Sequence, residues 1–158
     1  MMIRTGNGFD VHAFALDRKL ILCGTVIPCD QGLAGHSDAD VAVHALIDAI
    51  LGALALGDIG MWFPDHDDAY LDIDSMLLLK KVLADPRVAA WNIENCDITV
   101  IAQKPKLGAF RDAMRQTLAD AMDLAIDQIS VKFTTTEHLG FTGRGEGIAA
   151  IANVTLSR

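Results

Sequence analysis

The sequence predicts an α+β fold, in which helices cover one face of a mixed sheet of four to five strands. Segments of strand and helix character alternate along 158 residues without a linker, a repeat or a low-complexity stretch. The last strand segment, 148–156, is apolar on both faces, and helices on one side of the sheet would leave one of those faces exposed. We therefore expect a single domain over residues 1–158, with the uncovered sheet face packed against another subunit.

The strands are expected where short runs rich in β-branched and other apolar residues are bounded by turn residues. In the run NCDITVIAQ, Ile98 and Val100 are two positions apart and should point to the same face. The predicted strands are 3–12, 20–28, 95–103, 129–135 and 148–156.

Three helices are expected between these strands, at 38–56, 75–84 and 107–124. Gly57 breaks the first helix, and the second stops before Pro86. Ser37 is the expected N-cap of the first helix, with Asp40 three residues on as in a capping box. The polar run FPDHDDAY (63–70) should form a loop between the first two helices. The first helix carries apolar residues at helical spacing: Val41, Ala45, Ile47, Leu51 and Leu54.

Composition excludes several classes of protein. Apolar residues make up 51% of the chain, which argues against disorder. A net charge of −8 argues against nucleic-acid binding. No apolar run approaches the ~20 residues of a membrane span, and no secretory signal pattern is present, so a cytoplasmic location is expected. Cys23, Cys29 and Cys96 include no CxxC pair and are expected to be reduced and packed as small hydrophobic residues.

A metal site is suggested by Asp10 and His12, which lie two apart on a predicted strand and so share a face. His44, on the first helix, is a candidate third ligand. Such a set leaves a fourth tetrahedral position open, as in a catalytic zinc site, although manganese or iron would also suit it. Asp48 lies one helical turn beyond His44 and is a candidate carboxylate for orienting it. Spacing alone leaves the alternative that all four make ordinary hydrogen bonds or face solvent.

Phosphate-binding residues are suggested by two segments. His36 and Ser37 precede the first helix, whose N-terminus favours an anion, although Ser37 could act merely as a cap. In the second segment, TTTEHLGFTGRGEG, three threonine hydroxyls could hold phosphate oxygens and Glu137 a divalent cation. Arg144 lies in the glycine-rich part of that segment. The run AQKPKLG carries Lys104 and Lys106 and could hold a nucleotide. An ordinary strand end and a solvated loop are the alternatives for these two runs.

With these residues in place, the chain resembles the 2-C-methyl-D-erythritol 2,4-cyclodiphosphate synthase family of the non-mevalonate isoprenoid pathway. The motifs span nearly the whole chain: GFDVHAF, GHSDADVAVHALIDAILGALALGDIG, FPD, IAQKPK and TTTEHLGFTGRGEGIAA. The resemblance implies a phosphorus–oxygen lyase. In its reaction, the 2-phosphate of a cytidine-diphosphate-linked methylerythritol attacks the β-phosphate, which gives a cyclic diphosphate and releases CMP.

The resemblance also implies roles for individual residues. Zn²⁺ would be held by Asp10, His12 and His44, and Mg²⁺ or Mn²⁺ with the help of Glu137. His36 and Thr135 would stabilise the transition state. Family members are homotrimers with active sites between subunits, and their central cavity can bind isoprenoid diphosphates. The implied substrate contacts are Ser37, Asp58, Ile59, Gly60, Phe63, Asp65 and Asp67 for the sugar phosphate, Ala102, Lys106, Leu107 and Thr134 for the nucleotide, Thr136 as a further substrate contact, and Phe141 and Arg144 near the cavity.

The sequence departs from the family pattern at Asn7, where histidine is common, at Cys23, where glycine is frequent, and at His66 in the FPD loop. Lys104 and Gly108 also differ from the expected pattern after AQ. None of these positions is an expected metal ligand. Two other functions use the same features: a metal-dependent phosphohydrolase that activates water, and a trimeric binding protein for isoprenoid diphosphates.

Overall fold

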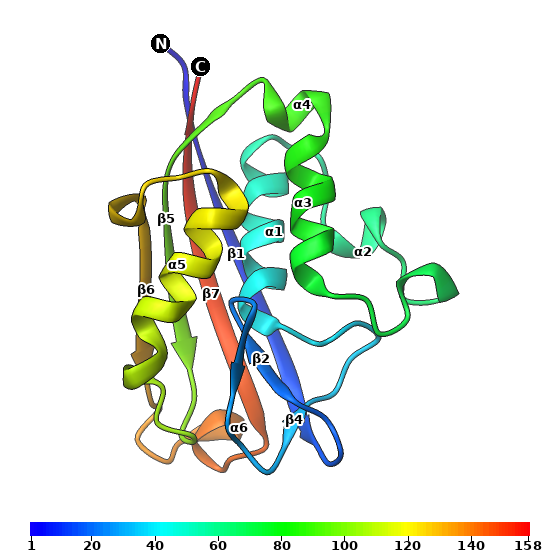
Figure 1. Ribbon diagram of the computed structural model, residues 1–158, viewed down its shortest axis with the longest axis vertical. Helices are drawn as coiled ribbons and strands as arrows, with labels where there is room; N and C mark the ends of the chain where they lie inside the picture. The colour runs from blue at the N-terminus through cyan, green and yellow to red at the C-terminus, as the bar shows by residue number, and fades with distance from the viewer.

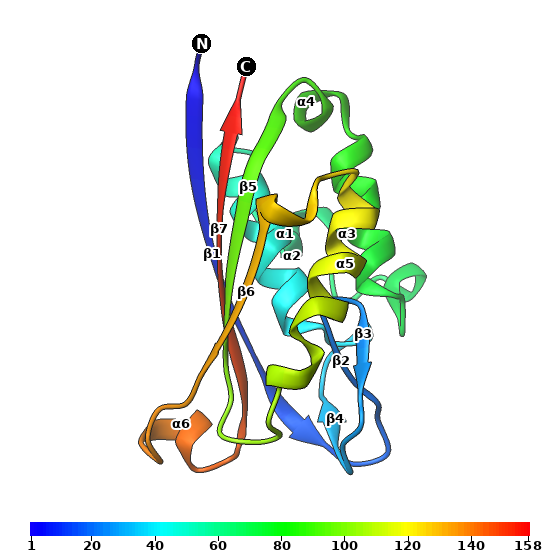
Figure 2. The same ribbon diagram turned by 60° about the vertical axis from the view of Figure 1, so that its left-hand side comes forward.

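The computed structural model describes all residues from 1 to 158 and has two layers, a five-stranded sheet and a layer of helices on one of its faces (Figures 1 and 2). The strand order is β4-β1-β7-β5-β6. Only β5 and β6 run parallel, so the sheet is mixed and the predicted α+β class is confirmed. The strands are β1 (Ile3–Ala15), β4 (Gly32–Leu33), β5 (Asn92–Ile101), β6 (Ile129–Thr134) and β7 (Gly147–Ser157).

Helices α1 and α5 pack on the sheet, and α3 lies against both of these helices on the side away from the strands (Figures 1 and 2). The apolar sides of α1 and α5 meet buried strand residues such as Ile98 and Val100, which do share a face as predicted. No helix is long and apolar enough to cross a membrane. The helices are α1 (Val41–Ala53), α2 (Ile59–Trp62), α3 (Ser75–Ala84), α4 (Pro86–Ala89), α5 (Arg111–Met122) and α6 (Gly140–Gly143), with short 3₁₀ turns at Asp68–Tyr70, Gly108–Phe110 and Ile126–Gln128.

Helix α1 packs unusually close to β1 because two glycines face it. A Cβ at Gly6 would lie 1.8 Å from the Ala49 carbonyl oxygen, and one at Gly8 would lie 1.9 Å from that of Ala45. Both distances are far inside van der Waals contact, so only glycine permits this approach. The close packing brings the side chain of His44, next to Ala45, down to the strand.

Helix α1 ends at Ala53 rather than at 56, and α5 begins at Arg111 rather than at 107. Two further predictions were wrong for local reasons. The expected strand 20–28 is a hairpin of β2 (Leu20–Leu22) and β3 (Thr25–Ile27). Its two turn residues, Cys23 and Gly24, have φ values of 51° and 69°, as in a type I′ turn, which explains why glycine suits position 23. Helix α1 begins at Val41, because the N-cap is Asp40 and not Ser37.

The other face of the sheet is not covered by helices (Figure 2). Phe9 and Val11 on this face are 55% and 41% exposed, so apolar surface remains open in the single chain. Two of the cysteines, Cys23 and Cys96, are buried as expected, whereas Cys29 is exposed, contrary to that expectation.

Candidate metal centre and nucleotide pocket

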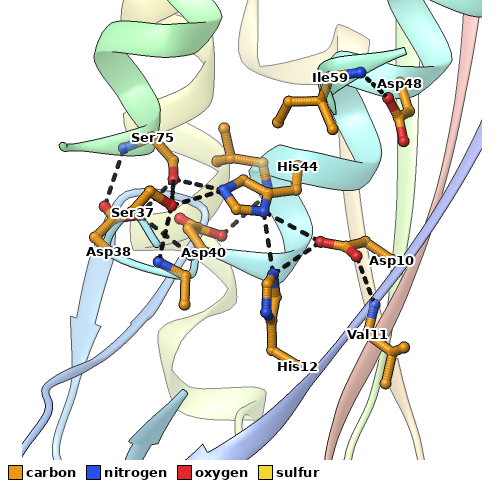
Figure 3. A network of polar contacts seen from close by, with 12 residues as sticks. Asp10, Val11, His12, Ser37, Asp38, Asp40, His44, Asp48, Ile59 and Ser75 are labelled. Atoms are coloured by element: carbon orange, nitrogen blue, oxygen red, sulfur yellow. Dashed lines mark hydrogen bonds and ion pairs between the residues drawn. The ribbon is translucent and has the colours of Figure 1, made fainter. Parts of the chain in front are cut away.

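Asp10, His12 and His44 converge between β1 and α1 (Figure 3). The Asp10 Oδ2 atom lies 3.0 Å from His12 Nε2 and 3.1 Å from His44 Nδ1. The two ring nitrogens are 3.1 Å apart. The strand supplies two of these residues on one face and the helix supplies the third, as the sequence predicted, so the proposed ligand atoms form a compact triangle.

The chemistry of this triangle fits a divalent cation. Burial alone would raise the pKa of Asp10, but hydrogen bonds and charge from His12 and His44 hold it well below its usual range. Burial also works against charge on His12, yet its hydrogen bond to Asp10 raises its pKa. A carboxylate and two imidazole nitrogens crowded at this distance have more lone pairs than protons to share. A bound cation satisfies all three at once, and carboxylate with imidazole is a common zinc donor set.

The opposite nitrogen of His44 has different partners from those expected. His44 Nε2 lies 3.0 Å from Ser37 Oγ and 2.9 Å from Ser75 Oγ. The predicted carboxylate partner, Asp48, instead accepts a hydrogen bond of 2.7 Å from the backbone N–H of Ile59. Figure 3 shows Asp48 directed away from the imidazole ring, toward the start of α2. Asp48 therefore anchors α2 to α1 and does not contact His44.

A cavity of about 570 Å³ opens beside the triangle and is lined by His12 and His44. The loop before α1 contributes the transition-state candidate His36 to its wall. His36 is held by a 3.0 Å hydrogen bond from Nε2 to the carbonyl oxygen of Asp67, and a carbonyl can only accept. Most of the predicted sugar-phosphate contacts line this cavity, namely Ser37, Ile59, Gly60, Phe63 and Asp65. His66, which departs from the family pattern, also lines it.

The remaining two predicted contacts of this group do not line the cavity. The Asp58 carboxylate caps α2 through the N–H of Met61. The Asp67 carboxylate caps the following 3₁₀ turn through the N–H of Ala69. Both carboxylates shape the polar loop around the cavity, and their helix-capping role was not foreseen from the sequence.

A second pocket, of about 450 Å³, lies at the carboxyl ends of β5 and β6. The run after β5 and the end of β6 form opposite walls, and Arg111 lies over the Phe133 ring with its guanidinium 5.4 Å from the ring centroid. All four residues expected to bind the nucleotide are here, together with the catalytic candidate: Ala102, Lys106, Leu107, Thr134 and Thr135.

The loop after β6 holds the other candidates. Thr136 Oγ1 bonds to the carbonyl oxygen of Leu139 and to Thr142 Oγ1, at 2.6 Å and 2.9 Å, so its hydroxyl fixes the loop. Glu137 contacts Thr135 and stands apart from the metal triangle. Phe141 is partly exposed, and Arg144 is paired with Glu146 at 2.6 Å.

The two pockets lie toward different edges of the sheet. The triangle is built on β1 and α1, whereas the second pocket is built on β5 and β6, and β7 separates these strand sets. Three strand spacings of ~4.8 Å separate β1 from β6. One chain therefore carries two separate pockets.

Sequence reasoning missed three residues around the metal triangle. Ser75 contacts His44 across 31 positions of sequence, and Asp38 accepts hydrogen bonds from Ser75. Arg18 donates to the Gly35 carbonyl at 2.9 Å and also to that of Ser37, and so holds the loop before α1. No spacing rule links such distant residues. The only local signal is a serine at a predicted helix start.

Comparison with known proteins supports this geometry. The sequence model of the YgbB family matches residues 3–157. The chain belongs to the YgbB family. One relative in this family, the 2-C-methyl-D-erythritol 2,4-cyclodiphosphate synthase of Moorella thermoacetica, is 56% identical, and the match covers 98% of this chain and 94% of the relative.

Some YgbB relatives are longer. The bifunctional enzyme IspD/IspF of Nitratiruptor sp. is 58% identical over 97% of this chain, which spans only 41% of that enzyme. The solved bifunctional IspDF from Campylobacter jejuni matches with a TM-score of 0.93 at 49% identity, over 98% of this chain and 42% of that one. IspF from Plasmodium falciparum, solved as a CDP complex, matches at 34% identity with a TM-score of 0.84, over 98% of this chain and 95% of that one.

Proposed function

We propose that this chain converts 4-diphosphocytidyl-2-C-methyl-D-erythritol 2-phosphate to 2-C-methyl-D-erythritol 2,4-cyclodiphosphate and releases CMP. The observation that carries the proposal is the Asp10–His12–His44 triangle beside a polar cavity, in a chain of the YgbB family. Relatives of similar length are named for this reaction. The substrate supplies both the attacking phosphate and the phosphorus that it attacks, so the protein needs no nucleophile of its own.

The protein's main contribution is to position the two phosphates and to manage their charge. A Zn²⁺ ion held by Asp10, His12 and His44 would offset the negative charge of the approaching phosphates. His36, at the cavity wall, and Thr135, in the second pocket, would donate hydrogen bonds where charge develops in the transition state. Lys106 would bind the cytidyl phosphates, and Glu137 would help hold Mg²⁺ or Mn²⁺. Fixing a flexible substrate in line for attack can remove ~7–11 kcal/mol from the barrier.

We propose that the complete site forms between subunits of a homotrimer. The metal triangle and the nucleotide pocket of one chain lie toward different edges of its sheet, and the uncovered face exposes Phe9 and Val11. On the same face, Asp97 Oδ1 is buried without a hydrogen-bond partner in the single chain. Packing this face against other copies would bury the apolar side chains and bring one chain's triangle to its neighbour's nucleotide pocket. Phe141 and Arg144 would then border a central cavity able to take an isoprenoid diphosphate.

Phosphorus NMR of the reaction products tests the activity. The cytidyl substrate should give a cyclic diphosphate and CMP with the purified protein, and none after chelation. A metal-dependent phosphohydrolase would release inorganic phosphate, and a mere binding protein would leave the substrate intact, so either spectrum would contradict the proposal.

Mixing two inactive variants tests the shared site. His44→Ala removes a metal ligand and Lys106→Ala removes a nucleotide contact, so each homotrimer should be inactive. After unfolding and refolding together in equal amounts, random assembly should give about a quarter of the sites an intact half from each variant. Activity that stays at the level of the separate variants, in trimers shown to be mixed by native mass spectrometry, would place the whole site within one chain.

A further inference from the structure

The side of His44 that faces away from the metal triangle is held by a buried polar chain. Ser75 Oγ lies 2.9 Å from His44 Nε2 and in turn contacts Asp38 Oδ1 (Figure 3). Ser75 is fully buried at the start of α3, and its backbone N–H also bonds to Asp38 Oδ2 at 3.1 Å. Three elements, the loop before α1, α1 itself and α3, therefore meet at one imidazole nitrogen.

The donors and acceptors in this series of hydrogen bonds determine the tautomer of His44. Asp38 faces only donors, namely the Ser75 hydroxyl, the Ser75 N–H and the Asp40 N–H, so it acts as an acceptor at both oxygens. The single hydroxyl proton of Ser75 is thus used on Asp38, and Ser75 can only accept from His44. The 2.9 Å contact with Ser75 is a hydrogen bond only if His44 Nε2 carries a proton, which leaves a lone pair on Nδ1, the atom that points into the triangle.

Ser37 also lies within reach of His44 Nε2 but is less suited to hold it. Its oxygen accepts from the N–H of Ala39 at 3.1 Å and lies 3.4 Å from Ser75 Oγ, and its side chain lines the cavity where substrate would bind. Ser75 is fully buried and does not line that cavity. Holding His44 through Ser75 leaves the Ser37 hydroxyl free for a ligand.

We infer that Ser75 and Asp38 form a relay that positions His44 as a metal ligand by fixing its Nε2–H tautomer and ring orientation. These are positioning residues, since Ser75 contacts His44 only at Nε2, on the side away from the proposed ligand atoms, and neither residue lines the cavity. The inference rests on the proposed metal site, and it adds α3 to the elements on which that site depends. Outer partners of this kind commonly change metal affinity by 10–100-fold.

Metal affinity and ligand geometry test the relay without reference to turnover. Zn²⁺ dissociation constants would be measured by competition with a chromophoric chelator. The ligand geometry would be followed through the visible absorption bands of the Co²⁺-loaded protein. Ser75→Ala should weaken Zn²⁺ binding by about 10-fold or more and shift the Co²⁺ bands. Asp38→Asn should weaken binding in the wild-type background but cause no further loss once Ser75 is alanine, because its effect passes through Ser75.

A matched control separates positioning from helix stability. Asp74 caps the same helix through the N–H of Met76, at 2.8 Å, and touches neither His44 nor the cavity. Asp74→Ala should lower the melting temperature but leave the Zn²⁺ dissociation constant and the Co²⁺ bands unchanged. Wild-type affinity and bands in Ser75→Ala, or additive losses with Asp38→Asn, would overturn the relay. Failure of the wild-type protein to bind Zn²⁺ would instead refute the proposed metal site.

Discussion

The contact between Gly8 and α1 gives a quantitative test of how the metal triangle is assembled. In Gly8→Ala, the new Cβ would lie 1.9 Å from the Ala45 carbonyl oxygen, whereas real Cβ contacts essentially never fall below 3.0 Å. Helix α1 must therefore move away from β1 by about 1 Å. His44 is on the helix, and Asp10 and His12 are on the strand, so this displacement opens the triangle directly.

Both the free energy of unfolding and the Zn²⁺ affinity of Gly8→Ala should be lower than those of the wild type. Overpacking of this kind costs ~1–3 kcal/mol, and more where the contact is with backbone. A loss of about 3 kcal/mol would lower the melting temperature by roughly 10 °C in a chain of this size. Ligand distances in metal sites are held within about 0.2 Å, so a 1 Å shift should weaken Zn²⁺ binding by at least 10-fold.

Calorimetric melting and chelator competition would measure the two effects, with two glycine-to-alanine controls. A Cβ at Gly108 meets nothing within 4 Å, and one at Gly52, also on α1, comes no closer than 3.9 Å to Asn7. Gly108→Ala should be neutral, and Gly52→Ala should stabilise the exposed helix position by up to about 1 kcal/mol. A Gly8→Ala variant that melts and binds Zn²⁺ like the wild type would refute the reasoning.

Three further outcomes are expected. Burial raises the pKa of Asp40 to about 6, so the free energy of unfolding should fall as this carboxyl ionises between about pH 4 and pH 6. Urea titrations should show that Asp40→Asn becomes more stable relative to the wild type as the pH rises through this range. A stability difference that stays constant with pH would contradict this. In the native protein, a thiol reagent should label the exposed Cys29 quickly and leave Cys23 and Cys96 unmodified until unfolding, since burial raises the pKa of Cys96 to about 12. Thr135→Ala should lower kcat by about 100-fold with unchanged Zn²⁺ affinity, and unaltered turnover would remove its assigned role.

The sequence was informative where a local rule decides the structure. Asp10 and His12 share a strand face by alternation, and α3 begins at Ser75 and ends at Ala84, before Pro86, as predicted. The hairpin at Cys23 was missed because that residue adopts a positive φ that its chemistry does not favour. A glycine there would have indicated the turn.

The partners of His44 illustrate what local rules cannot give. Asp48 has the correct helical spacing, yet the start of α2 uses its carboxylate. Ser75 reaches the imidazole only because α3 packs beside α1, and this tertiary placement has no trace in spacing. The shared face of Asp10 and His12 was therefore predictable from residue type and period, and the family resemblance added His44, whereas the groups that orient His44 depend on how the helices pack.

The pairing of the first and last strands has a consequence for chain architecture. Met2 and Arg158 exchange two backbone hydrogen bonds, of 2.7 Å and 2.9 Å, at the tip of the molecule where both termini lie (Figure 1). Along β1, Asp10 is about 25 Å from that tip at ~3.3 Å per residue. A short linker could join the ends in a circular permutant, and a second module appended to either end would extend from the tip, well clear of the metal ligands.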